Sequence, residues 1–130
     1  MIILCLRTDT ATARLSLYRN EQLTVEMSWE AGRALSSTLH ANLQQLLTKA
    51  QLELDDIDAI AVYEGPGSFT GLRIGVSTAN AFAYALNIPI VGVRGDNWIA
   101  QAIKKLSKDQ LQVFIKPYYA APAKTTQPRK

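Results

Sequence analysis

The feature that most constrains the fold is a glycine-rich turn between an apolar run and a long small-residue segment. Residues 59–63 read Ala-Ile-Ala-Val-Tyr, which is typical of a buried strand. Residues 72–86 are rich in alanine and long enough for about four turns of helix. Gly65, Pro66 and Gly67 predict the turn that joins them, and Ser68 or Thr70 can cap the helix. The sequence therefore predicts strand, tight turn and helix in direct succession.

This glycine-rich turn has two interpretations. Glycines let a backbone approach a phosphate closely, and the N-terminus of the following helix attracts anions. However, no Lys-Ser/Thr pair follows at P-loop spacing, and Gly-x-Gly-x-x-x-Gly differs from the dinucleotide-binding fingerprint. A small phosphate- or nucleotide-binding enzyme that uses residues 65–71 and Asp9 therefore stays an alternative.

Small residues recur along the predicted helix at four-residue steps: Gly71, Gly75, Ala79 and Ala83. Ridges at this spacing suit close packing of two helices, and small residues let the backbones approach. A surface helix normally has a charged outer face. Between residues 72 and 88 the only charge is Arg73, so we expect both faces of this helix to be covered.

A second segment without charge, residues 34–50, carries leucines at three- and four-residue steps and is predicted to be a helix. Its other side includes Ser37, Ala41 and Gln45, with no charge between Arg33 and Lys49. Composition leaves two explanations open: the two charge-poor helices pack on each other, or they share a partner-binding face.

The remaining segments complete an α/β pattern. Three short strands near residues 2–6, 14–17 and 23–29 predict an antiparallel meander, and 88–93 predicts a further strand. A helix over 99–106, capped by Asp96, follows, and Leu111 to Ile115 can add a last strand. The expected order is β-β-β-α-β-α-β-α in one domain over residues 1–115, followed by a basic, proline-containing tail over 116–130.

The motif from Gly65 to Gly75 (Gly-Pro-Gly-Ser-Phe-Thr-Gly-Leu-Arg-Ile-Gly), with residues 56–62 before it, resembles the signature of the TsaB (YeaZ-type) family. TsaB proteins are non-catalytic partners of TsaD, the enzyme that makes threonylcarbamoyladenosine in tRNA. The resemblance implies one lobe of the actin-like ATPase (ribonuclease H-like) fold with a mixed five-stranded sheet. Family members commonly have a second lobe. Because 130 residues leave no room for one, we expect a short single-lobe form.

The residues argue against catalysis by this chain. Typical TsaB sequences end the first strand with Ile-Asp-Thr, whereas this chain has Leu6-Arg7-Thr8. Arginine cannot hold magnesium, but its permanent positive charge suits contact with an anion. Arg7 and Arg73 are therefore the two candidate anion contacts. His40 is the sole histidine, which excludes His-rich metal sites. Ser68 lacks the Gly-x-Ser-x-Gly spacing of a nucleophile elbow. We therefore expect no catalytic residue, metal or cofactor.

By resemblance, the two charge-poor helices would pair with the equivalent helices of a TsaD-type subunit. The expected interface residues are Ser37, Ala41, Gln45, Ser68, Gly71, Leu72, Gly75, Ala79 and Ala83. We expect Gly75→Leu or Ala79→Arg to block this pairing and to leave the fold intact. The resemblance also implies a TsaE-type ATPase in the complex, contact with tRNA mainly through the complex, and a homodimer when the chain is alone. A direct tRNA-binding accessory, using Arg73, the lysines near residue 105 and the tail, is a further alternative.

Composition adds two expectations. The chain has one cysteine, so no disulfide can form within it, and a reducing cytoplasm is the expected compartment. No window of eighteen apolar residues occurs, so no membrane span is expected. The net charge of +3 permits nucleic-acid contact without requiring it.

Overall fold

The computed structural model describes residues 1–108 together with 115 and 116. Its elements are β1 (Ile2–Arg7), β2 (Thr12–Arg19), β3 (Gln22–Glu30), the short 3-10 helix η1 (Gly32–Ala34), α1 (Leu35–Ala50), η2 (Leu54–Asp56), β4 (Ala59–Tyr63), α2 (Phe69–Leu86), β5 (Ile90–Val93) and α3 (Trp98–Ser107). This order confirms the predicted β-β-β-α-β-α-β-α succession. The predicted strand over 111–115 and the tail from Pro117 to Lys130 lie outside the described residues, apart from Ile115.

The five strands form one mixed sheet in the order β3-β2-β1-β4-β5. The first three strands pair antiparallel, as the predicted meander requires. Strand β4 pairs parallel with β1, and β5 pairs parallel with β4. The sheet is therefore antiparallel at one edge and parallel at the other, which confirms the expected architecture.

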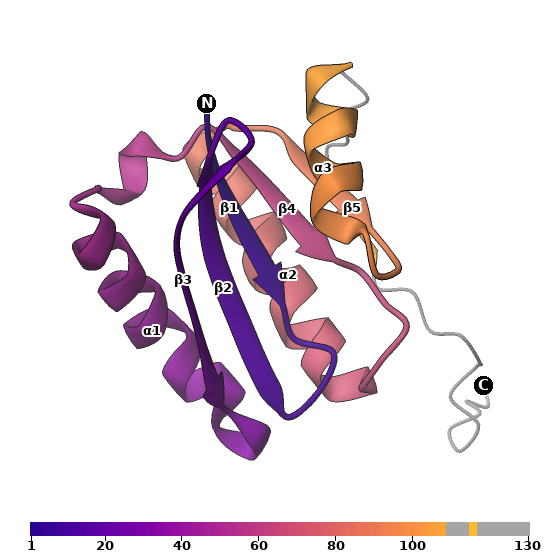
Figure 1. Ribbon diagram of the computed structural model, residues 1–130. Coiled ribbons are helices and arrows are strands. Elements are labelled where there is room, and N and C mark those ends of the chain that lie inside the picture. The colour runs from indigo at the N-terminus through magenta and orange to yellow at the C-terminus, as the bar shows by residue number, and fades with distance from the viewer. Residues whose placement is uncertain (109–114, 117–130) are drawn as a thin grey trace.

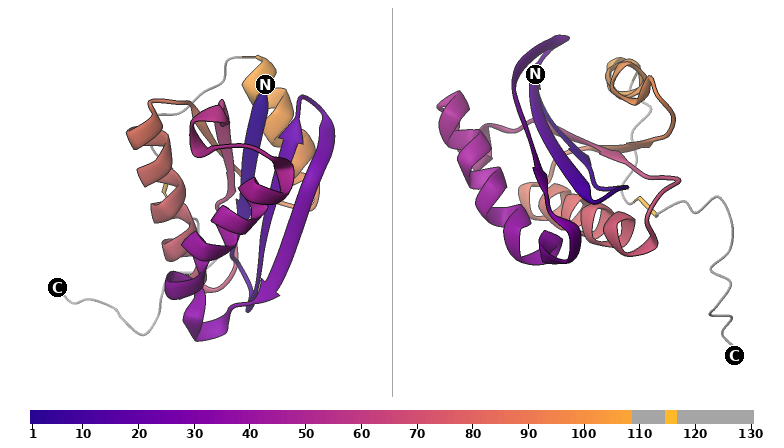
Figure 2. Two further views of the ribbon diagram at one scale, coloured as in Figure 1. Left: turned by 90° about the vertical axis from the view of Figure 1, so that its left-hand side faces the viewer. Right: turned by 60° about the horizontal axis from the view of Figure 1, so that its bottom comes forward.

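Helices cover the two faces of the sheet unequally. Helices α1 and α2 lie on one face, whereas α3 lies on the opposite face beside β4 and β5 (Figures 1 and 2). Because side chains alternate along a strand, Leu4 and Leu6 of β1 join the core under α1 and α2, and Ile3 and Cys5 join the core under α3. The second face is left without a helix over β2 and β3.

Local contacts fix the two larger helices. The leucines that predicted α1 are buried against the sheet, and the Trp29 indole of β3 donates a hydrogen bond of 3.0 Å to Thr38 Oγ1. Ser68 caps α2 as expected, because its hydroxyl accepts a hydrogen bond from the Gly71 N–H at 3.3 Å. The helix predicted over 99–106 is present as α3, but its predicted cap was wrong: Asn97, not Asp96, occupies the cap position, and it makes no side-chain capping bond.

Cys5 is buried in β1, and that burial raises the pKa of its thiol from 9.0 to about 12, although a hydrogen bond with Ser16 acts in the opposite direction. The cause is desolvation, which disfavours the thiolate. The native chain therefore keeps the thiol proton at a pH where the unfolded chain has lost it.

Unfolding should become easier at alkaline pH because of this thiol. Below pH 9 the thiol keeps its proton in both the folded and the unfolded state, so the free energy of unfolding has its full value. As the pH rises from about 9 towards 12 only the unfolded state ionises, so the free energy of unfolding falls by up to about 1.4 kcal/mol per pH unit. Urea titrations of the wild type and Cys5→Ala across this range check it. Parallel pH profiles for the two proteins would contradict the assignment.

Candidate functional site

The glycine-rich turn before α2 packs directly on the turn between β1 and β2. The backbone N–H of Ser68 donates to the carbonyl oxygen of Asp9 at 2.7 Å. A Cβ atom placed at Gly67 would overlap Asp9. The glycine is therefore needed for the close approach of two backbone segments that are far apart in the sequence.

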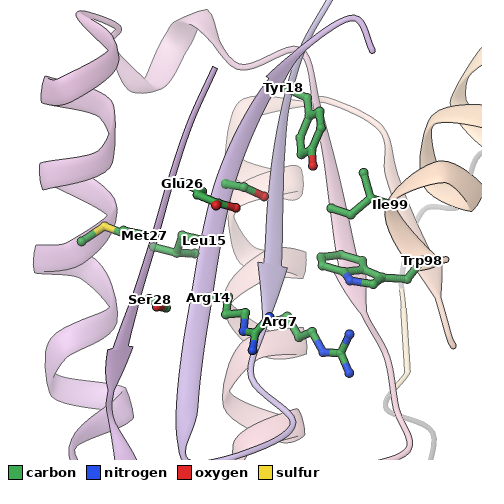
Figure 3. Close-up of a pocket in the computed structure, with 10 residues that line it drawn as sticks. Arg7, Arg14, Leu15, Tyr18, Glu26, Met27, Ser28, Trp98 and Ile99 are labelled. Atoms are coloured by element: carbon green, nitrogen blue, oxygen red, sulfur yellow. The ribbon is translucent and has the colours of Figure 1, made fainter. Parts of the chain in front are cut away.

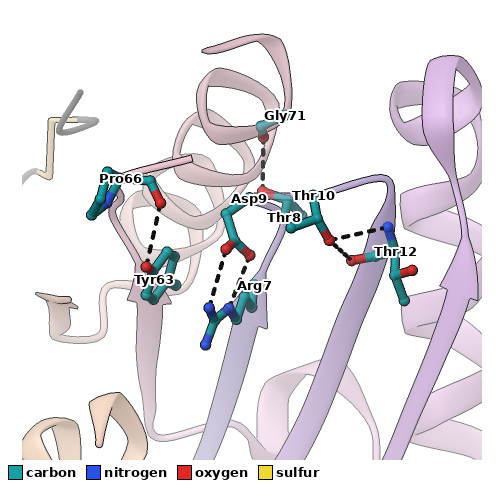
Figure 4. A network of polar contacts seen from close by, with 8 residues as sticks. All are labelled: Arg7, Thr8, Asp9, Thr10, Thr12, Tyr63, Pro66 and Gly71. Carbon is teal, nitrogen blue, oxygen red and sulfur yellow. Dashed lines mark hydrogen bonds and ion pairs between the residues drawn. The ribbon is translucent and has the colours of Figure 1, made fainter. Parts of the chain in front are cut away.

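Thr8, the residue before Asp9, also bonds to α2, about one helical turn beyond Ser68. Its side chain is only 1% exposed, and its hydroxyl donates a hydrogen bond of 2.7 Å to the Gly71 carbonyl oxygen (Figure 4). A Cβ atom at Gly71 would overlap the Thr8 carbonyl oxygen, and one at Gly75 would overlap the Thr8 hydroxyl. Gly71 and Gly75 thus let α2 lie against the end of β1.

These contacts overturn one prediction about the small-residue stripe. Gly71, Leu72, Gly75, Ala79 and Ala83 are all buried inside the domain. They set the distance between α2 and the sheet, not the distance to another chain. The expectation that Gly75→Leu or Ala79→Arg would leave the fold intact fails for the same reason, because either side chain would enter the packed interior.

The outer side of α2 is a different stripe, offset by two residues. Arg73, Ser77, Ala81 and Ala85 follow one another at four-residue steps and are exposed, and Tyr84 beside them is 89% exposed. Sequence reasoning missed this stripe, although its spacing and small side chains match those of the buried one. The sequence held a weak signal for this orientation, because Arg73 and Ser77 lie in the outer stripe whereas Leu72 and Val76 lie on the buried side.

The predicted positions on α1 do lie on the surface. Ser37, Ala41 and Gln45 are exposed along the side of α1 that faces away from the sheet. Helices α1 and α2 lie on the same face of the sheet (Figure 2) and meet where the His40 and Phe82 rings approach to 5.6 Å between centroids. We call the exposed sides of the two helices the two-helix face: Ser37, Ala41, Gln44, Gln45, Thr48, Ser77, Ala81, Tyr84 and Ala85. Ser68, also exposed, lies at the start of α2 as its cap.

The two predicted anion contacts are not brought together. Arg7, at the end of β1, donates from Nε and Nη2 to the two carboxylate oxygens of Asp9, at 2.9 and 3.1 Å (Figure 4). This hydrogen bond, more than any other contact, raises the pKa of Arg7. The guanidinium also lies 4.0 Å above the Tyr63 ring. Arg73 instead lies on α2 near Phe69, so the two arginines occupy different parts of the surface.

The chemistry-bearing groups near the turn have structural partners. Both Asp9 oxygens accept from Arg7, Ser68 caps α2, and the glycines admit the β1–β2 turn. Within residues 1–108 and 115–116, no three His, Cys, Asp or Glu side chains are grouped as metal ligands would be. In the same part of the chain no helix is long and apolar enough to cross a membrane.

A mixed sheet with this strand order, covered by helices on both faces, places the chain in the α/β class of actin-like and ribonuclease H-like lobes. Residues 29–115 match the family model described as TsaD: tRNA N6-adenosine threonylcarbamoyltransferase. The chain belongs to this family, and its structural likeness makes it a TsaB-type (YeaZ-type) member.

Comparison with known proteins supports this placement. YeaZ from Pseudomonas aeruginosa has a TM-score of 0.69 at 28% identity over 84% of this chain and 50% of that one. A Mycobacterium tuberculosis protein described as uncharacterized is 38% identical over 93 residues, 70% of this chain and 44% of that protein. The tRNA N6-adenosine threonylcarbamoyltransferase of Geotalea daltonii is 46% identical over 63 residues, 48% of this chain and 18% of that enzyme. The chain thus spans half the length of YeaZ and less than half the length of the two other relatives.

Replacing Gly71 by alanine should destabilise the fold by about 1–3 kcal/mol. Alanine is more favourable than glycine inside a helix by about 1 kcal/mol. At this position, however, its Cβ would overlap the Thr8 carbonyl oxygen, which belongs to the backbone and cannot rotate away. Urea denaturation measures the change.

Ser77→Ala is the matched control, because Ser77 is exposed on the same helix and should change stability by less than about 0.5 kcal/mol. Equal stability of Gly71→Ala and the wild type would show that α2 does not lie as close to Thr8 as described.

Proposed function

We propose that the chain is a non-catalytic subunit for synthesis of N6-threonylcarbamoyladenosine in tRNA, and that it binds a TsaD-type subunit through the two-helix face. The family match and the likeness to YeaZ support the pathway. The observation that carries the binding role is the surface itself. Two neighbouring helices expose serine, alanine, glutamine and tyrosine, with no charge between Arg33 and Lys49 on one helix and Arg73 alone on the other.

The shape of this face supports protein binding. Small side chains at Ala41, Ser77 and Ala81 let a second pair of helices approach closely. Tyr84, almost fully exposed, offers a large amphipathic side chain of the kind enriched at interfaces. A four-helix layer built this way would bury about 800 Å² on each partner, the usual size of a specific interface.

The non-catalytic role rests on what the reactive side chains do instead. His40 packs against Phe82, and Cys5 is buried with a strongly raised pKa. Asp9 is occupied by Arg7. The alternative of an enzyme built on residues 65–71 loses support, because the packing of Thr8 and Asp9 accounts for Gly67 and Gly71.

The other partners follow from the same proposal. In the cytoplasm the complex would include a TsaE-type ATPase and would contact tRNA mainly through the TsaD-type subunit. The chain alone would cover its two-helix face by forming a homodimer, because a two-fold contact lets the same uncharged face of two copies cover each other. A direct tRNA contact through the tail concerns residues outside those described.

Placing an arginine on the two-helix face should block partner binding. Ala81→Arg and Ala41→Arg put a charge where a partner helix must approach, so affinity for the TsaD-type subunit of the same organism should fall by at least about tenfold. Isothermal titration calorimetry with purified subunits measures it.

Ala100→Arg is the matched control, because Ala100 is exposed on α3 at the opposite face of the sheet. It should bind as the wild type does. If all three variants bind equally well, the interface lies elsewhere on the molecule.

A further inference from the structure

A pocket of about 430 Å³ lies on the side of the sheet opposite the two-helix face (Figure 3). Its floor is the polar side of β1, β2 and β3, and its wall is the start of α3, with Trp98 and Ile99. It exists because α3 covers β4 and β5 but not the meander. The strand residues that line it include Arg7, Arg14, Tyr18, Glu26 and Ser28.

Two arginines lie side by side on neighbouring strands of this floor. In the strand register Arg7 lies directly opposite Arg14, and Arg14 lies opposite Ser28. Side chains opposite one another in an antiparallel pair project from the same side of the sheet, and like charges in that position are destabilising. Both arginines line the pocket, so an anion bound there would offset this repulsion.

The two guanidinium groups differ in how they are held. Arg7 is fixed by Asp9 and by the Tyr63 ring, yet the Asp9 contacts use two of the five N–H donors that a guanidinium carries. Arg14 is exposed, and its side chain makes no hydrogen bond or ion pair within the described residues. One donor group is therefore pre-positioned, and a second is available beside it.

We propose that this pocket binds a phosphate group in the part lined by Arg7, Arg14 and Ser28. Guanidinium groups bind phosphate through paired N–H donors, and a serine hydroxyl adds a further donor. Glu26 lies two residues from Ser28 along β3, so its carboxylate repels an anion from that end of the pocket. It would instead accept a hydrogen bond from an N–H group elsewhere on the ligand. Trp98 and Ile99 supply an apolar wall for a ring.

The charged residues around the pocket make one end positive and the other end negative. Asp9 neutralises part of the Arg7 charge, and Asp96, near the start of α3, also acts on Arg7. Arg14 therefore carries most of the available positive charge, and Glu26 the available negative charge. The same phosphate chemistry is offered by a small phosphate monoester and by the backbone of an RNA strand.

NMR titration of the 130-residue chain tests the site, with inorganic phosphate, adenosine monophosphate and a short single-stranded RNA as separate probes. The Trp98 indole and the Arg14 Nε–H resonances should shift and saturate with phosphate and with at least one larger probe. The Trp29 indole is an internal reference, because it is bonded to Thr38 on the other face of the sheet. Whichever larger probe binds more tightly identifies the source of the phosphate.

Three variants make the test specific. Arg14→Gln should weaken phosphate binding by about tenfold. Glu26→Gln should strengthen it by removing a nearby negative charge. Arg33→Gln, which makes the same charge change at an exposed position outside the pocket, should have no effect.

The proposal fails if none of the probes gives a saturable shift at Trp98. It also fails if acetate shifts Trp98 as strongly as phosphate does, or if Arg14→Gln and Arg33→Gln weaken binding equally. Amide spectra of each variant check that the fold is unchanged.

Discussion

The packing of α2 against the β1–β2 turn determines most of what this molecule presents to its surroundings. The Thr8 hydroxyl reaches the Gly71 carbonyl, and the absence of side chains at Gly71 and Gly75 lets the helix come close enough for that hydrogen bond. Once this edge of the helix is turned inward, its rotation about its own axis is fixed. Ser77, Ala81 and Ala85 must then face outward, on the same side of the sheet as the exposed residues of α1.

Unequal coverage of the sheet gives the protein two surfaces of different chemistry. On one face α1 and α2 bury Leu4, Leu6 and their neighbours, and the outer sides of these helices have few charges. On the other face α3 covers only the parallel strands, so the alternating side chains of the meander, Arg14 and Glu26 among them, remain accessible. In the two proposals made above, a protein partner would cover the first surface and a phosphate-bearing ligand would occupy the second.

Reactive residue types in the described chain are used for structure. Cys5 is buried, Ser68 caps a helix, Asp9 is paired with Arg7, and His40 packs on Phe82. Each of these contacts satisfies a polar group or fills space.

The sequence by itself determined the element order, the leucine side of α1, the cap at Ser68 and the existence of a small-residue stripe on α2, because periodicity and turn chemistry are local properties. The tertiary structure alone decided which side of α2 faces inward. Both sides of that helix carry mostly small residues, and Arg73 is the only charge that marks the outer side, so hydrophobic patterning distinguished them only weakly. The orientation depends on the contact between Thr8 and Gly71. These residues are 63 positions apart, so no local sequence pattern predicts the contact. The sequence likewise did not predict that Arg7 and Arg14 are neighbours, because that depends on the register of β1 and β2.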